Sequence, residues 1–351
     1  TAKILSLIRE NSGISRADIA KATHLSRPTV SLIVDRLLEQ RLIGETGKGD
    51  SSGGKRPILL EIRPDAFFAI GIDIGDEFYL RGVLCNGLGQ VVKQTEIAYV
   101  NHFDRIVDGI NDLVYTLQKA LPDVAPRGIG IAVSGIVAPE GNEVIGSSNF
   151  DIAGRRLAEV ISHYHNLPVL VANRARVAAC AELISGAAVG CRDFIYISAG
   201  KSIGSAIYAG GRLLTGHGGA AGEILSIHIP TDHGNVGMIP FEQVVRESYL
   251  LERIQAATGR SWTLIELIAA FNSSSDAEAV RIVEECAAHC AYAIGVLCGI
   301  INPAIIVLGG RFKEFGPRFL ERFSALLQQR LPLSGSAGLQ IAVSAYGRIG
   351  T

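Results

Sequence analysis

The sequence predicts a small helical domain over residues 1–62, followed by an α/β body with two related halves over residues 63–185 and 186–351. Three short segments with apolar residues at helical spacing open the chain. From Ala66 the composition turns apolar, and strand-like segments alternate with long helical stretches. The order of strands, hairpin, helix and strand partly recurs after Cys191, which predicts a duplicated α/β fold with a central cleft.

The composition is typical of a soluble protein with large cores. The 351 residues are 48% hydrophobic and 19% charged, and they include 40 glycines. No apolar run approaches the roughly 18 residues of a membrane span. The opening segment, TAKILSLIRENSG, predicts an amphipathic helix rather than a signal peptide. The six cysteines form no C-x-x-C pair, which favours free thiols and a cytoplasmic location.

The first 62 residues contain three predicted helices and a modest positive charge. Ile4, Leu7 and Ile8 mark the first helix, Ser15 starts the second as an N-cap, and Ser26 caps the third. The ten Lys/Arg residues of this segment exceed its seven Asp/Glu residues by three, whereas the whole chain has a net charge of −1. This excess permits nucleic-acid binding without proving it.

The third predicted helix has the features of a recognition helix. Its apolar face consists of residues at helical spacing, namely Val30, Ile33, Val34, Leu37 and Leu38. The opposite face begins with Arg27, Thr29 and Ser31. In a helix-turn-helix the N-terminal side chains of the last helix contact bases in the major groove. The pattern therefore predicts double-stranded operator DNA as a partner.

Residues 42–62 resemble the wing of a winged helix-turn-helix. Two strand-like segments, Leu42-Ile43 and 58–62, enclose a Gly/Ser-rich loop with basic residues. A flexible linker is the alternative for such a composition, but the three helices before it favour a wing whose cations contact phosphates. The predicted DNA-binding residues are Ser26, Arg27, Thr29, Ser31, Lys48, Lys55 and Arg56.

The stretch VLVANRARVAACAE, residues 169–182, joins a predicted buried strand to a predicted helix. Asn173 and Arg174 stand at the exit of the strand, where open α/β sheets bind ligands. The alternative role for Asn173 is a helix N-cap.

Six segments, in this order, resemble the ROK family of repressors, open reading frames and sugar kinases. They are Asp73-x-Gly75, GIGIAVSGIV at 128–137, Asn149, the Asn173 junction, YISAGKSIGSAI at 196–207 and GHGGAAGE at 216–223. The resemblance implies an actin/hexokinase-like (ribonuclease H-like) ATPase fold for the body. It also implies that the head is the winged helix-turn-helix of the family's repressor members.

The sequence departs from the ROK kinases at residues that handle phosphate. Asp76 and Glu77 replace small residues of the first phosphate loop, and like charges repel ATP. Arg174 stands where the kinases have their catalytic Asp, and a guanidinium does not deprotonate in proteins. A one-residue shift would not restore a base, because no acid occurs between Val169 and Ala181. We therefore predict that the chain is not an enzyme and has no catalytic residue.

The zinc motif of the family is absent as well. Ser226 stands at the position of the family's zinc histidine, and residues 231–242 contain no cysteine. A replacement site made of His217, His228 and His233 is the alternative. The sequence predicts neither a bound metal nor another cofactor.

The resemblance implies a sugar site, because four polar residues match family residues that hydrogen-bond sugar hydroxyls. With Arg174 and Ser226 added, the predicted ligand-binding residues are Asn149, Asn173, Arg174, Glu223, Ser226 and Glu242.

Arg174 predicts a preference for an anionic sugar derivative, since an unpaired cation in a closed cleft is costly. Lys201 of the second phosphate loop would add to the positive field. The alternative is an internal ion pair from Arg174 to Glu223, Asp76 or Glu77.

Together these observations predict a sugar-responsive, DNA-binding transcriptional repressor with a catalytically inactive sugar-kinase fold as its sensor. A ligand would change the closure of the two halves and the spacing of DNA heads in a homodimer or homotetramer. Two alternatives stay open: an active carbohydrate kinase with an appended DNA-binding head, and a constitutive DNA binder with a vestigial cleft.

Overall fold

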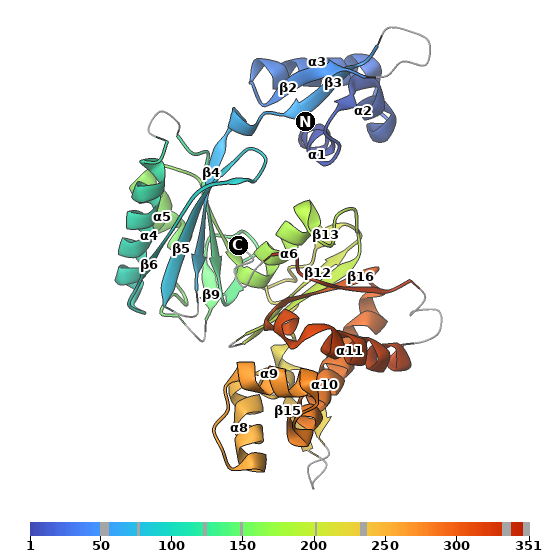
Figure 1. Cartoon of the computed structure of the whole chain (residues 1–351). Coiled ribbons are helices and arrows are strands. Elements are labelled where there is room, and N and C mark those ends of the chain that lie inside the picture. The colour runs from blue at the N-terminus through green and yellow to red at the C-terminus, as the bar shows by residue number, and fades with distance from the viewer. Residues whose placement is uncertain are drawn as a thin grey trace. The chain divides into compact units, whose positions relative to one another are not determined.

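A computed structural model of the chain describes residues 1–49, 56–75, 78–121, 125–147, 150–200, 202–231, 237–331 and 338–346. Its contacts divide the chain into two compact units (Figure 1). The first unit comprises Thr1–Val133 and Phe150–Val171. The second unit comprises Ser134–Asn149 and Ala172–Thr351.

The N-terminal head is a winged helix-turn-helix, as predicted. Its elements are α1 (Ala2–Glu10), β1 (Ile14–Ser15), α2 (Arg16–Thr23), α3 (Arg27–Glu39), β2 (Ile43–Lys48) and β3 (Ile58–Ile62). The strands pair antiparallel in the order β1-β3-β2, so that β2 and β3 form the wing. The Ser15 and Ser26 hydroxyls accept the N–H groups of Asp18 and Thr29, which caps α2 and α3.

The first unit also contains a five-stranded sheet with the order β10-β7-β4-β5-β6. The strands are β4 (Phe68–Ile74), β5 (Tyr79–Asn86), β6 (Val91–Ala98), β7 (Ile129–Val133) and β10 (Val169–Asn173). β5 pairs antiparallel with β4 and β6, whereas β7 pairs parallel with β4. The helices α4 (Phe103–Gln118) and α5 (Leu157–His165) lie side by side (Figure 1), linked by His165 Nε2 and Asn111 Oδ1 at 2.9 Å.

The second unit repeats this plan with the order β13-β12-β11-β16-β17. The strands are β11 (Phe194–Ala199), β12 (Ile203–Ala209), β13 (Arg212–Leu213), β16 (Ile305–Gly310) and β17 (Gln340–Val343). β12 pairs antiparallel with β11 and β13, whereas β16 pairs parallel with β11. Each sheet therefore has an antiparallel meander followed by a strand parallel to its first member, which confirms the predicted duplication.

Helix α6 (Arg174–Ser185) packs within the second unit. Ala175, Ala178 and Ala179 bury their methyl groups in the cluster that contains Phe194 and Tyr208 of the second sheet. The division by contacts falls between residues 171 and 172, and the domain boundary after residue 185 stays a prediction.

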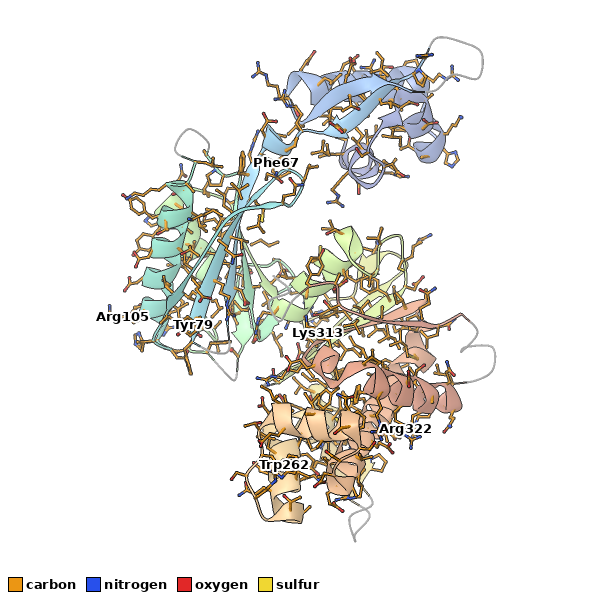
Figure 2. All side chains as sticks on the ribbon, viewed as in Figure 1. Phe67, Tyr79, Arg105, Trp262, Lys313 and Arg322 are labelled. Atoms are coloured by element: carbon orange, nitrogen blue, oxygen red, sulfur yellow. The ribbon has the colours of Figure 1, made fainter. Side chains whose placement is uncertain are left out.

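Glu182 on α6 is fully buried and binds the C-terminal segment of the second unit. Its Oε1 accepts the Ser344 hydroxyl and the Ala345 N–H, and its Oε2 accepts the Ala187 N–H. Lys313, which Figure 2 labels, donates to the Tyr346 carbonyl at 2.8 Å. The three hydrogen bonds to Glu182 satisfy a buried carboxylate whose transfer from water would otherwise be costly.

Helix α10 (Ala277–Ile301) is the core helix of the second unit. It is long and apolar enough to span a membrane, but 11 of its side chains are buried in the unit. It packs against α7 (Phe241–Val245), α8 (Glu247–Thr258), α9 (Leu264–Ser273) and α11 (Gly316–Arg330). Cys286, Cys290 and Cys298 lie on its buried face.

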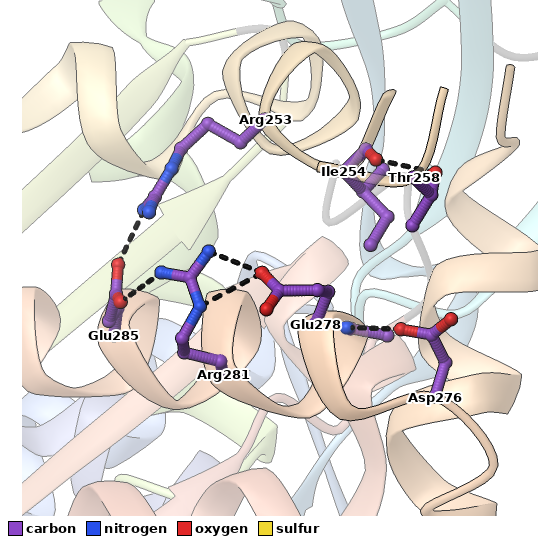
Figure 3. A network of polar contacts seen from close by, with 8 residues as sticks. Arg253, Ile254, Thr258, Asp276, Glu278, Arg281 and Glu285 are labelled. Atoms are coloured by element: carbon purple, nitrogen blue, oxygen red, sulfur yellow. Dashed lines mark hydrogen bonds and ion pairs between the residues drawn. The ribbon is translucent and has the colours of Figure 1, made fainter. Parts of the chain in front are cut away.

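A polar network joins α10 to α8 on the outside of this core (Figure 3). Arg281 binds Glu278 and Glu285, at 2.5 and 2.6 Å, and Glu285 also accepts from Arg253 of α8 at 2.6 Å. Asp276 caps the helix by accepting the Ala279 N–H at 2.9 Å. The cap and the ion pairs fix the first turns of α10.

Candidate functional site

The Asn173 junction lies where β10 ends and α6 begins. The Asn173 Oδ1 accepts the N–H groups of Ala175 and Arg176 at 2.9 and 3.3 Å, which confirms the N-cap. Its Nδ2 donates to the Gly135 carbonyl at 2.9 Å. The side chain is 9% exposed, so its amide mainly organises the protein backbone. A sugar contact from Asn173 stays a prediction.

Arg174 is half-buried in the first turn of α6. Its Nη1 lies 3.5 Å from the Ser134 hydroxyl, which precedes the carbonyl bound by Asn173. Asn173, Arg174 and Ser134 therefore lie close together at the end of β10. Asp76 and Glu77 lie outside the described residues, so the predicted ion pairs with them are not tested.

Arg176 is the organising residue that the sequence reasoning missed. Its side chain is 6% exposed, and its Nη2 donates to the carbonyls of Gly219 and Ala221 at 2.6 and 3.0 Å. These carbonyls belong to the GHGGAAGE loop, which the guanidinium therefore fastens to α6. A cation in the first turn opposes the helix dipole, and this unfavourable position was the available sequence signal.

Glu223 is the last residue of this loop and the N-cap of the short η2 turn (Ile224–Ser226). Burial raises the pKa of the Glu223 carboxyl, the nearby Arg176 guanidinium opposes that shift, and the Glu242 carboxylate adds to it. The fold therefore brings two of the predicted sugar-binding residues, Glu223 and Glu242, into one electrostatic group with Arg176. Two carboxylates beside one guanidinium offer acceptors for the hydroxyls of a polyol.

Ser226 is exposed at the end of the same turn. Its carbonyl lies 2.9 Å from His228 Nδ1, at the start of β14 (His228–Thr231). β15 (Gly237–Pro240) pairs with β14 and returns the chain to Phe241, whose N–H donates to Ile227 at 2.7 Å. This hairpin carries Glu242 back to the Glu223 turn.

Three of the predicted residues, Asn149, Lys201 and His233, lie outside the described residues. Within the described part of the chain, no group of three His, Cys, Asp or Glu side chains has the spacing of a metal site.

The head exposes the predicted DNA-reading residues. Ser26, Arg27 and Thr29 are exposed, Ser31 is half-buried, and the Ser26 and Thr29 hydroxyls lie 2.8 Å apart. Arg56 is exposed in the wing, whereas Lys55 and the side chain of Lys48 lie outside the described residues.

Leu32 is a further candidate that the sequence reasoning did not select. It lies on α3 with 55% of its surface exposed, although its residue type suits a core position. An exposed apolar side chain on a recognition helix can contact a thymine methyl group.

Family models match both the head and the body of the chain. The ROK family model matches residues 69–343, and a winged helix-turn-helix DNA-binding model matches residues 2–43. This chain belongs to the ROK family. With its DNA-binding head, the protein is a ROK-type transcriptional regulator, as the resemblance implied.

Named relatives agree with this architecture. The ROK chain is 30% identical over 363 residues to a xylose repressor of Caldicellulosiruptor bescii, covering 97% of this chain and 90% of the relative. A crystal structure of a ROK transcriptional regulator, a homologue of the Escherichia coli Mlc protein, superposes with a TM-score of 0.83 at 22% identity. That match covers 99% of this chain and 92% of the other.

The fold is shared with ROK sugar kinases. A Streptomyces griseus glucokinase, solved with glucose and AMPPNP, superposes with a TM-score of 0.68 at 22% identity. The match covers 81% of this chain and 96% of the kinase. The similarity shows that the ROK body has the sugar-kinase fold, as predicted.

We expect Arg176→Ala to loosen the GHGGAAGE loop. The change removes two charge-assisted hydrogen bonds, which together contribute on the order of 2 kcal/mol. The amides of Ala221 and Glu223, which bond within the loop to Thr215 and Ala220, should exchange with solvent roughly 30-fold faster. Hydrogen-exchange mass spectrometry measures this. Arg212→Ala, at an exposed residue of β13, is the control; unchanged exchange in Arg176→Ala would contradict the assigned role.

We expect ionisation of Glu223 to lower stability. Because its pKa is raised above 4.5, the folded protein binds more protons here than the unfolded chain does. Stability from this group is therefore lost as pH rises from about 4.5 through the raised pKa. Urea unfolding across pH 4.5 to 7 should show this slope, and Glu223→Gln should remove it. Exposed Glu252→Gln should keep the slope; a slope that survives in Glu223→Gln would show that another group titrates.

Proposed function

We propose that this ROK protein is a sugar-responsive transcriptional repressor whose body binds a ligand without phosphorylating it. The observation that carries the proposal is Arg174 at the position of the kinase base, next to the Asn173 cap in the first turn of α6. A guanidinium cannot take the proton from a sugar hydroxyl. The Glu223 and Glu242 carboxylates near Arg176 can still accept hydrogen bonds from sugar hydroxyls.

The relatives guide the choice of ligand. Because a relative at 30% identity is named a xylose repressor, D-xylose is the first ligand to test. An anionic sugar derivative is the alternative, since the Arg174 guanidinium can donate two parallel hydrogen bonds to a carboxylate or phosphate. Calorimetry with D-xylose, D-xylonate and D-xylose 5-phosphate separates the two.

The proposed setting is the cytoplasm, where the head would find operator DNA. Heads that read half-sites one helical turn apart work as symmetric pairs. We therefore propose a homodimer or homotetramer.

We expect the ligand to weaken operator binding without being consumed. In the proposed mechanism the preferred sugar binds the DNA-free state more tightly, so the dissociation constant for DNA rises about tenfold or more at saturation. Fluorescence anisotropy of a duplex selected by the protein measures this change. In parallel, ADP release should stay at background with each sugar and ATP. Turnover near 1 per second would instead support the alternative of an active kinase with a DNA-binding head.

We expect α3 and the wing to contribute differently to DNA binding. Arg27→Ala and Thr29→Ala should each cost about 1–3 kcal/mol on the selected duplex and much less on random DNA. Lys55→Ala and Arg56→Ala should weaken both duplexes alike and reduce the salt slope by about one each. Anisotropy over a salt series decides. Equal losses on both duplexes for Arg27→Ala and Thr29→Ala would remove α3 as the reader.

A further inference from the structure

The head and the first sheet are joined by a short, well-bonded linker, residues 63–67. Arg63 follows β3, and its N–H donates to the Leu42 carbonyl at 3.2 Å, which fastens the linker to the start of the wing. Its guanidinium binds Asp65 through two hydrogen bonds, at 3.1 and 2.8 Å. The η1 turn (Pro64–Ala66) then leads into β4. The linker therefore has a defined conformation and is not a flexible tether.

The turn between β5 and β6, residues 86–90, holds this linker from the side of the sheet. The Gly87 N–H donates to the Pro64 carbonyl at 2.9 Å. A β-carbon on Gly87 would lie 2.9 Å from the Arg63 carbonyl and 3.4 Å from the ring of Phe67, which Figure 2 labels at the linker. Only a residue without a side chain permits this approach of two backbone segments.

Asn86 gives the turn a fixed shape. Its Oδ1 accepts the N–H groups of Leu88 and Gln90, each at 3.0 Å, and its Nδ2 donates to the Gln90 side chain at 3.0 Å. The turn can therefore pass a displacement to the linker instead of absorbing it.

The same two strands reach the loop that the family uses for phosphate. β4 and β5 stay in register from Phe68 opposite Asn86, beside the linker, to Ile74 opposite Leu80. At the far end the Gly75 N–H donates to Tyr79. Seven residues of strand span about 20 Å, so an antiparallel ladder joins the Gly75–Tyr79 loop to the linker.

We propose that the 86–90 turn is the element through which the sensor body and the DNA head communicate. The proposal deepens the proposed function, on which it rests, by naming its route of regulation. A displacement at the end of the ladder where Ile74 pairs with Leu80 moves the ladder, the ladder moves the turn, and the Gly87–Pro64 contact moves the linker with the wing. Since coupling is reciprocal, DNA bound at the head must also change the loop at the far end.

Hydrogen exchange with and without DNA tests this route without any sugar. In the parent chain, a saturating selected duplex should change exchange at least twofold in peptides that cover residues 74–80. Gly87→Ala forces the turn away from the linker and should abolish that change while DNA affinity stays within about threefold. Gly89→Ala is the matched control. It strains a positive-φ glycine of the same turn, at φ +77°, but its β-carbon would meet no atom within 4 Å.

A second pair of variants tests the same route in case Gly87→Ala does not fold. Asn86→Ala removes the two acceptor bonds that shape the turn and should also reduce the change at 74–80, whereas Asn86→Asp keeps an acceptor and should restore it. The proposal would be overturned if the parent chain showed no DNA-linked change in exchange at 74–80. It would also be overturned if Gly87→Ala and Asn86→Ala both showed the same change as the parent chain. Failure of every sugar to alter DNA binding would overturn the proposed function alone, because the DNA-linked exchange does not depend on sugar.

Discussion

The glycine-rich loop of the second unit is held to α6 by a buried guanidinium that donates to two backbone carbonyls. Arg176 reaches from the first turn of α6 to Gly219 and Ala221, although both burial and the helix dipole disfavour a cation there. The cost is offset because each donated hydrogen bond is charge-assisted and because the Glu223 carboxylate lies nearby. This anchor adds to the backbone bonds within the loop and to the β14–β15 hairpin, which brings Glu242 back to the Glu223 turn.

The two halves share a duplicated topology, and only the first copy carries the proposed transmission element. Each half has a meander followed by a parallel strand, yet the two copies differ in their third strands. β13 has only two residues, whereas β6 has eight. β6 pairs with β5 from Val91 to Ala98, whereas β13 pairs with β12 at only two positions, so only the first copy has a full third strand.

The sequence predicted what depends on periodicity and caps. Ser26 located the start of α3 as its N-cap. Asn173 was predicted as a cap and as a ligand contact. Sequence alone could not show that its Nδ2 donates a hydrogen bond to the carbonyl of Gly135, 38 residues away. Arg176 and the Gly87–Pro64 contact were missed for the same reason, because their partners are backbone carbonyls whose positions depend on the tertiary fold.

The buried cysteines of α10 have a consequence for the chemistry of the protein under oxidative stress. Burial raises the pKa of the Cys298 thiol to about 11, and burial likewise raises that of Cys290 far above its usual value. At pH 7 only about one Cys298 in ten thousand is then a thiolate, the form that peroxide attacks. Cys290 and Cys298 are therefore poorly reactive toward peroxides and alkylating agents as long as the second unit stays folded, and labelling of these two thiols would report its opening.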